Sequence, residues 1–133
     1  MVMKTLGGRK DIVLRVGNMM KHQACLKYKA TADVFIDRFV LGLGVNGLEA
    51  LAMGIPVIAH ARPKDEECIL REVGYLPYYD APPARLADAV DILLSDTAVY
   101  QEYVDRATEY MAKFHDAPVV AKRYAQICAG VRK

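Results

Sequence analysis

A glycine-rich turn that runs into a helix is the part of the sequence best suited to bind an anion. Gly42 and Gly44 are separated by a single residue, and good helix formers follow from Gly47 to Met53. Glycines allow the backbone to approach a ligand closely, and the free N–H groups at the start of a helix attract anions. The residues predicted to contact a phosphate are Leu43, Gly44, Val45 and Asn46.

Glu49 follows this turn at a spacing that suits a nucleotide. At about 1.5 Å of rise per residue, it lies roughly 5 Å further along the helix axis than the predicted phosphate. There its carboxylate could accept hydrogen bonds from the two hydroxyls of a ribose. A glutamate near a helix start is also a common solvated partner of the helix dipole. The spacing alone leaves both interpretations of Glu49 open.

The segments around this turn indicate an α/β fold. Short runs rich in β-branched and aromatic residues alternate with helix-forming runs. Strands are predicted over 11–16, 32–36, 55–59 and 75–79, and helices over 19–30, 47–53 and 63–73. This alternation is typical of a parallel sheet with helices on both faces, in which ligands collect beyond the carboxyl ends of the strands. The polar residues expected at those ends include Asp37, Arg38, His60 and Arg62.

The remaining segments are predicted to frame this sheet. Residues 1–10 are expected to be a loop or a frayed start. Asp80, followed by prolines, is predicted to begin a helix, and Thr97 and Asp116 to begin a C-terminal pair of helices over 97–131. The first helix of the pair has a stripe expected in the core or at a subunit contact: Tyr100, Tyr103, Ala107, Tyr110 and Phe114.

Length and charge narrow the class of protein. A chain of 133 residues predicts a single domain, 1–133, and is too short for an enzyme whose active site lies between two full-sized domains. Residues 1–30 carry seven Lys or Arg and one acidic residue, a net charge of +6, whereas the other residues carry −4. That asymmetry suits either an anionic partner or a solvated face. The overall net charge of +2 is too small to indicate a nucleic-acid partner.

Cysteine usage and hydropathy predict a cytoplasmic protein. Cys25, Cys68 and Cys128 form no CxxC pair, and the histidines have no ligand spacing with them, so no metal site is expected. No run approaches the ~20 apolar residues of a membrane span, and no signal peptide is evident. We expect a cytoplasmic protein with reduced thiols and no transmembrane segment.

Three segments together resemble a known family. Ala32–Ile36 (ADVFI), Gly42–Gly44 (GLG) and Leu48–Ala59 (LEALAMGIPVIA) resemble the donor-binding half of group 1 glycosyltransferases, which are retaining enzymes of the GT-B fold. The resemblance continues more loosely from about Asp11 to the C-terminus. It implies the C-terminal, donor-binding domain of that family, truncated at its N-terminal side. The fold implied is a small Rossmann-like three-layer domain with about four parallel strands and a helical C-terminal extension.

The resemblance also implies roles for individual residues. Glu49 matches the glutamate that binds the nucleotide ribose, and Gly42 and Gly44 match glycines that approach the phosphates. Leu41 stands where the family has a glutamate that contacts the donor sugar. The family's basic residues that neutralise the diphosphate have no counterpart. Arg38, Arg62 or the basic N-terminal segment could replace them. His60 could contact the same ligand or be an ordinary surface histidine.

These roles define the expected function and its alternatives. The first expectation is a glycosyltransferase-like domain that binds a nucleotide sugar as substrate, uses no separate cofactor, and needs a separate acceptor-binding chain for sugar transfer. The second is a degenerate, non-catalytic interaction or assembly module, and the third is a nucleotide-binding regulator. The family strands that the chain lacks predict a rearranged four-stranded sheet or a homo-oligomer. No nucleic acid is expected as partner.

Overall fold

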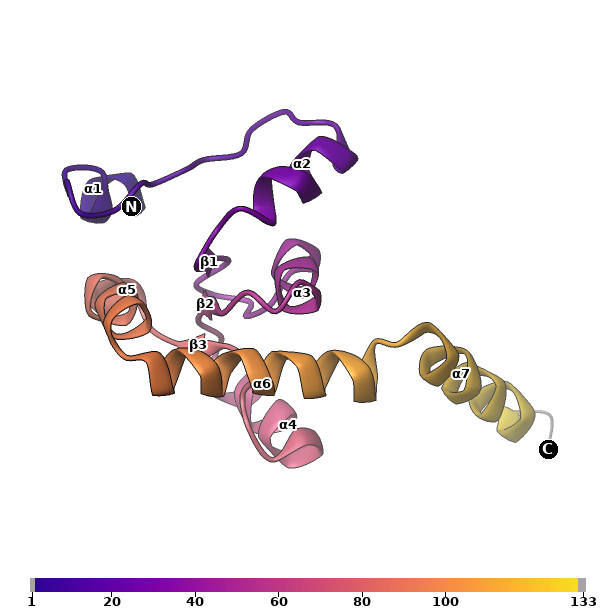
Figure 1. Ribbon diagram of the computed structural model, residues 1–133. Coiled ribbons are helices and arrows are strands. Elements are labelled where there is room, and N and C mark those ends of the chain that lie inside the picture. The colour runs from indigo at the N-terminus through magenta and orange to yellow at the C-terminus, as the bar shows by residue number, and fades with distance from the viewer. Residues whose placement is uncertain (1, 132–133) are drawn as a thin grey trace.

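The computed structural model describes residues 2–131 and shows a mixed α/β fold with a small parallel sheet (Figure 1). The strands are β1 (Phe35–Ile36), β2 (Val57–Ala59) and β3 (Tyr79–Asp80). The helices are α1 (Val2–Leu6), α2 (His22–Lys29), α3 (Val45–Ala52), α4 (Pro63–Val73), α5 (Leu86–Ser95), α6 (Thr97–Phe114) and α7 (Ala117–Val131), with a 3₁₀ turn η1 (Pro83–Arg85) before α5. The predicted α/β class is therefore confirmed.

The three strands run parallel in the order β1-β2-β3. Phe35 pairs with Val57, and Ala59 pairs with Asp80. The pairing of β1 with β2 continues past the strand ends, because the His60 N–H donates to the Arg38 carbonyl oxygen at 2.9 Å. All three strands consequently end at one edge of the sheet, where ligands of open parallel sheets collect.

The core lies on both faces of the sheet because successive residues of β2 point in opposite directions. Ile58 packs in a cluster with buried residues of α1 and α5, whereas Val57 and Ala59 pack in a second cluster with buried residues of α3 and α6. Figure 1 shows α5 and α3 on opposite sides of the strands. Burial on both faces explains why β2 is apolar throughout, with no alternation of polar residues.

Two predictions at the N-terminus are wrong. Residues 2–6 form a helix rather than a loop, because Leu6 is buried in the core beside α5. Residues 11–16 form no strand, so the described sheet has three strands rather than about four. The alternating apolar residues Ile12 and Leu14 instead pack against the core. Just before this segment, Arg9 forms an ion pair with Asp91 of α5 at 2.6 Å.

The predicted C-terminal pair of helices is confirmed as α6 and α7, and α7 extends away from the sheet (Figure 1). The stripe of α6 reaches the core: Ala107 is fully buried, and Tyr103 and Tyr110 pack against the two clusters. Among the described residues, no helix combines the length and apolar character needed to cross a bilayer.

The cap of α6 is Asp96 and not Thr97. One carboxylate oxygen of Asp96 accepts hydrogen bonds from the Ala98 and Val99 N–H groups at 3.0 and 3.1 Å. We expect Asp96→Ala to lower the free energy of unfolding by about 1 kcal/mol, since an N-cap satisfies N–H groups that the helix leaves unpaired. Thr97→Ala should have little effect. Thermal unfolding of the two variants checks this, and a larger loss from Thr97→Ala would contradict it.

The prediction that Asp80 begins a helix is wrong. Asp80 closes β3, and the chain passes through η1 before α5 starts at Leu86. Its carboxylate instead hydrogen bonds with the His60 ring across the sheet, Nδ1 to Oδ1, at 2.7 Å. Asp80, which resembles a helix cap in the sequence, is therefore the last residue of a strand.

Candidate functional site

The carboxyl edge of the sheet brings together the loops that follow β1 and β2. The Gly42 N–H donates to the His60 carbonyl oxygen at 3.1 Å, and Leu41 forms an antiparallel bridge with Ala61. The glycine-rich turn therefore crosses the end of β2 before it enters α3. Arg38, Gly42 and His60, predicted separately as site residues, all lie at this edge.

The start of α3 has a different partner from the one expected. The Gly44 N–H donates to Oδ2 of Asp37 at 2.6 Å, so this N–H is already bonded to a carboxylate. Arg38 lies directly over the same turn, and its Nη2 donates to the Leu43 carbonyl oxygen at 3.0 Å. A side chain on Gly44 would come within 2.8 Å of that guanidinium. Gly44 thus makes room for Arg38.

Other groups at the start of α3 are open to an anion. Within the described part of the chain, the Val45 and Asn46 N–H groups have no hydrogen-bond partner, and Arg38 makes no ion pair. The helix dipole adds partial positive charge at this end. Asp37 opposes these groups with a full negative charge. An anion here would gain from Arg38 and α3 and lose part of that gain to Asp37.

Gly42 is explained by the fold without any ligand. Its φ of +65° lies in the left-handed region, and a Cβ there would stand 3.1 Å from the Cβ of Ala61 and 3.5 Å from the Tyr78 hydroxyl. We expect Gly42→Ala to destabilise the protein by about 1–2 kcal/mol, the usual cost of a left-handed non-glycine residue. Gly8→Ala is the control, because Gly8 has open space around it and no positive φ. Equal stabilities of the two variants in thermal unfolding would contradict this explanation.

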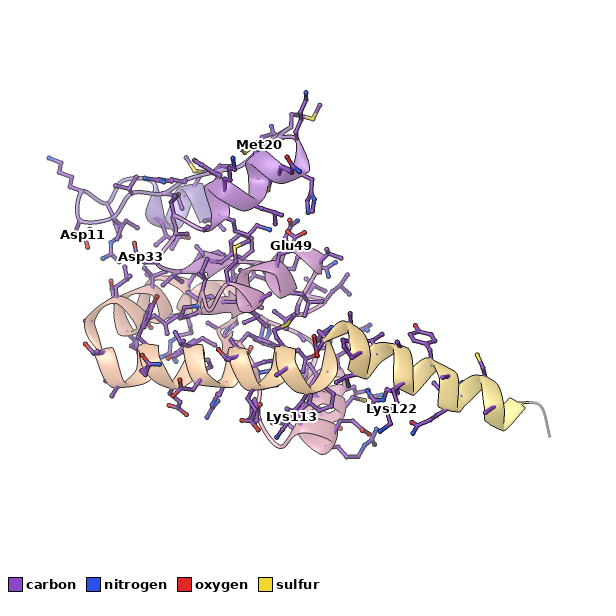
Figure 2. The ribbon with its side chains drawn as sticks, turned by 45° about the vertical axis from the view of Figure 1, so that its right-hand side comes forward. Asp11, Met20, Asp33, Glu49, Lys113 and Lys122 are labelled. Atoms are coloured by element: carbon purple, nitrogen blue, oxygen red, sulfur yellow. The ribbon has the colours of Figure 1, made fainter. Side chains whose placement is uncertain are left out.

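Glu49 is held between two helices by a buried lysine. Lys29, at the end of α2, has a side chain that is only 3% exposed, and its Nζ donates to Oε2 of Glu49 at 2.5 Å. The same Nζ donates to the side-chain and backbone oxygens of Asn46 at 3.1 and 3.2 Å. His22, at the other end of α2, contacts the second oxygen of Glu49 at 2.8 Å. Figure 2 shows Glu49 between α3 and α2.

This arrangement keeps Glu49 ionised. The hydrogen bond from Lys29, followed by the contact with His22, holds the pKa of Glu49 below its usual value. The ammonium group is satisfied as well, since each of its three protons has an acceptor and the ring of Phe35 lies 5.2 Å away. The result is a fixed carboxylate, 21% exposed, on the second turn of α3.

Lys29 is a candidate residue that the sequence did not indicate. Cys25 and Leu26 precede it by four and three positions, so all three lie on one helix face. A lysine on the apolar face of a helix is the signal that could have found it, because a buried lysine requires a carboxylate partner. Lys27, two residues earlier, is exposed, so the residue type alone does not predict that Lys29 is buried.

A second cluster lies at the ends of β2 and β3. His60, Asp80 and Glu66 of α4 have potential ligand atoms within 4.8 Å of one another. Burial, followed by the charge of Asp80, raises the pKa of Glu66. Glu66 is therefore not a freely solvated residue of the helix start, and His60 is not an isolated surface histidine.

The remaining candidates lie apart from these clusters. Arg62 donates to the Asp65 carboxylate at 2.7 Å and is occupied by that contact. Leu41 is exposed and carries no charge at the position where the resembled family has a glutamate. Arg38 is consequently the arginine placed at the start of α3.

Comparisons of this chain with protein-family models, with curated proteins and with solved structures give no match.

Proposed function

We propose that this chain is a Rossmann-like nucleotide-sugar-binding domain of the glycosyltransferase type, which places a nucleoside diphosphate over the start of α3. The observation that carries the proposal is the fixed, ionised carboxylate of Glu49. Among the sequence-predicted site residues, it is the one that combines a fixed, ionised carboxylate with partial exposure to a ligand.

The ribose would bind at Glu49. Each carboxylate oxygen now has one protein partner and can accept a further hydrogen bond. Lys29 is buried and holds Oε2 in place, whereas His22 is 71% exposed and can yield to a ligand. A pair of adjacent hydroxyls therefore finds an oriented acceptor that requires little reorganisation.

The diphosphate would bind at the first turn of α3. Arg38 and the N–H groups of Val45 and Asn46 supply the positive charge, in place of the family's basic pair. Asp37 reduces this attraction, and Leu41 offers the donor sugar no charged contact. The site therefore suits binding better than it suits departure of the diphosphate, which requires charge neutralisation.

Transfer of the sugar would need a second chain. Several large apolar side chains are exposed near the carboxyl edge and along the N-terminal segment: Val13, Val16, Met19, Val40, Leu41 and Val45. Exposed apolar groups of this kind favour association with a partner. The proposed partner is a separate acceptor-binding chain or a second copy of this one.

Asp37 favours one alternative function. A carboxylate that caps α3 through Gly44 satisfies the helix start without any ligand. A domain that has lost donor binding and serves in assembly would have this property. The two functions differ in whether any nucleotide binds.

Calorimetric titration of the full chain with UDP, GDP, ADP and their sugar conjugates tests the proposal. A nucleotide at 100 times its dissociation constant should raise the free energy of unfolding by about 2.7 kcal/mol. Saturable binding of one nucleotide per chain would support the donor site. A folded protein that binds none of them would leave the assembly function as the better explanation.

A further inference from the structure

The cluster of His60, Glu66 and Asp80 has the composition of a metal site. Each residue offers one ligand atom, and these atoms lie within 4.8 Å of one another. The three residues come from different parts of the fold: His60 follows β2, Asp80 ends β3, and Glu66 lies in the first turns of α4. We propose that they bind a divalent transition-metal ion such as Zn²⁺.

The sheet places two of the ligands side by side. Ala59 of β2 is the register partner of Asp80 of β3, so His60 lies one residue beyond that pair. The Ala81 N–H donates to the Ala59 carbonyl oxygen at 3.0 Å, which holds the two strand ends together at this point. The positions of His60 and Asp80 are thus determined by backbone pairing and not by mobile loops.

Buried groups hold the third ligand toward the other two. Oε1 of Glu66 accepts from the Ala61 N–H at 3.4 Å and from the Tyr78 hydroxyl at 3.5 Å. Tyr78 is completely buried. Its ring fixes the hydroxyl, and these two contacts hold one oxygen of Glu66 in place beside Asp80 and His60. Groups that orient a metal ligand in this way contribute to metal affinity.

The charge of the cluster favours a cation. Glu66 and Asp80 stand close together, and within residues 2–131 no lysine or arginine forms an ion pair with either of them. The nearest arginines in sequence are engaged elsewhere, Arg62 with Asp65 and Arg85 with Asp88. Within the described residues, Asp80 forms its ion pair with the His60 ring. A bound dication would neutralise both carboxylates.

The ligand set selects the kind of ion. One imidazole nitrogen with two carboxylate oxygens suits Zn²⁺ and neighbouring transition metals, whereas Mg²⁺ and Ca²⁺ prefer oxygen alone. A tetrahedral zinc ion with bonds of about 2.0–2.1 Å holds its ligand atoms roughly 3.4 Å apart. Small rotations of these side chains would reach that spacing, and one coordination position would remain open to water.

A calorimetric titration of the full chain with Zn²⁺, in the absence of nucleotide, tests the site. We expect binding of one ion per chain, weakened at least tenfold by His60→Ala and by Asp80→Asn. His115→Ala and Cys68→Ser are the matched controls, a histidine and a thiol outside the cluster, and both should bind as the wild type does. Circular dichroism establishes that each variant is folded, and Glu66→Gln serves if either of the first two is not.

Two results would overturn the proposal. One is the absence of saturable Zn²⁺ binding to the folded wild type. The other is binding that survives in the cluster variants or that falls equally in the controls, which would assign the ion to thiols or to a surface histidine. Because no nucleotide is present, the outcome is independent of the donor-site proposal.

Discussion

Replacing Glu49 by alanine should lower the free energy of unfolding by about 2–3 kcal/mol, a large effect for a residue on a helix surface. The reason is Lys29, whose buried ammonium would lose its carboxylate partner. Breaking a buried ion pair costs about 3–5 kcal/mol. The lower value is expected here because Glu49 is partly exposed and Lys29 keeps its two bonds to Asn46. Chemical denaturation of the variant measures the loss.

The double variant Lys29→Met, Glu49→Leu supplies the control for this prediction. It removes both charges together and fills the space with apolar groups of similar size. Its stability should lie within about 1 kcal/mol of the wild type, since replacing a whole buried pair by apolar residues is often neutral. Glu72→Ala, at an exposed glutamate of α4, should have little effect. A Glu49→Ala variant as stable as Glu72→Ala would contradict the buried-pair account.

The double variant also matters for any binding experiment. A loss of nucleotide binding in Glu49→Ala alone has two explanations, a missing ribose contact and a destabilised α2–α3 contact. The double variant removes the carboxylate and keeps the packing. It therefore separates the binding role of Glu49 from its structural role.

Substitutions at Arg38 and Asp37 should change nucleotide affinity in opposite directions. Arg38→Ala removes the guanidinium above α3 and is expected to weaken nucleoside-diphosphate binding about tenfold, the equivalent of one charge-assisted hydrogen bond. Asp37→Asn keeps an oxygen that can accept from the Gly44 N–H but removes the negative charge. We expect it to strengthen binding roughly five- to tenfold, as the repulsion between like charges a few ångströms apart is lost.

Matched controls and salt dependence sharpen this prediction. Arg71→Ala and Asp33→Asn change the same charges at exposed positions away from α3 and should leave the affinity unchanged. The effects of Arg38 and Asp37 should shrink as salt is added, because salt screens exposed charges. Equal affinities for Arg38→Ala and Asp37→Asn would contradict a diphosphate at the start of α3.

The sequence predicted elements whose signals are local. α4 has the predicted bounds of Pro63 to Val73, because a proline starts it and Gly74, at φ +87°, ends it. The strand predicted over 55–59 from its apolar run is present over Val57–Ala59. The strand predicted over 11–16 failed because its alternating residues pack on the core without pairing to β1. Periodicity reports which residues face inward but not whether a neighbouring strand is present.

The candidate site could be read from the sequence only in part, for the same reason. Gly42, Gly44 and Glu49 stand close together in the chain, so their spacing could be interpreted directly. Their partners Lys29 and Asp37 act through contacts across α2 and the β1 end that spacing does not reveal. The cluster of His60, Glu66 and Asp80 depends on the register of β2 with β3, which no local pattern specifies.

The most direct test of the donor-site account is a calorimetric titration of UDP, GDP and ADP into the wild type and into the Lys29→Met, Glu49→Leu double variant. The account predicts that one of these nucleotides saturates a single site on the wild type. It also predicts that the double variant, folded and of similar stability, binds the same nucleotide at least tenfold more weakly. Equal affinity for the two proteins, or no binding to the wild type, would contradict the assignment of Glu49 and α3 as a nucleotide site.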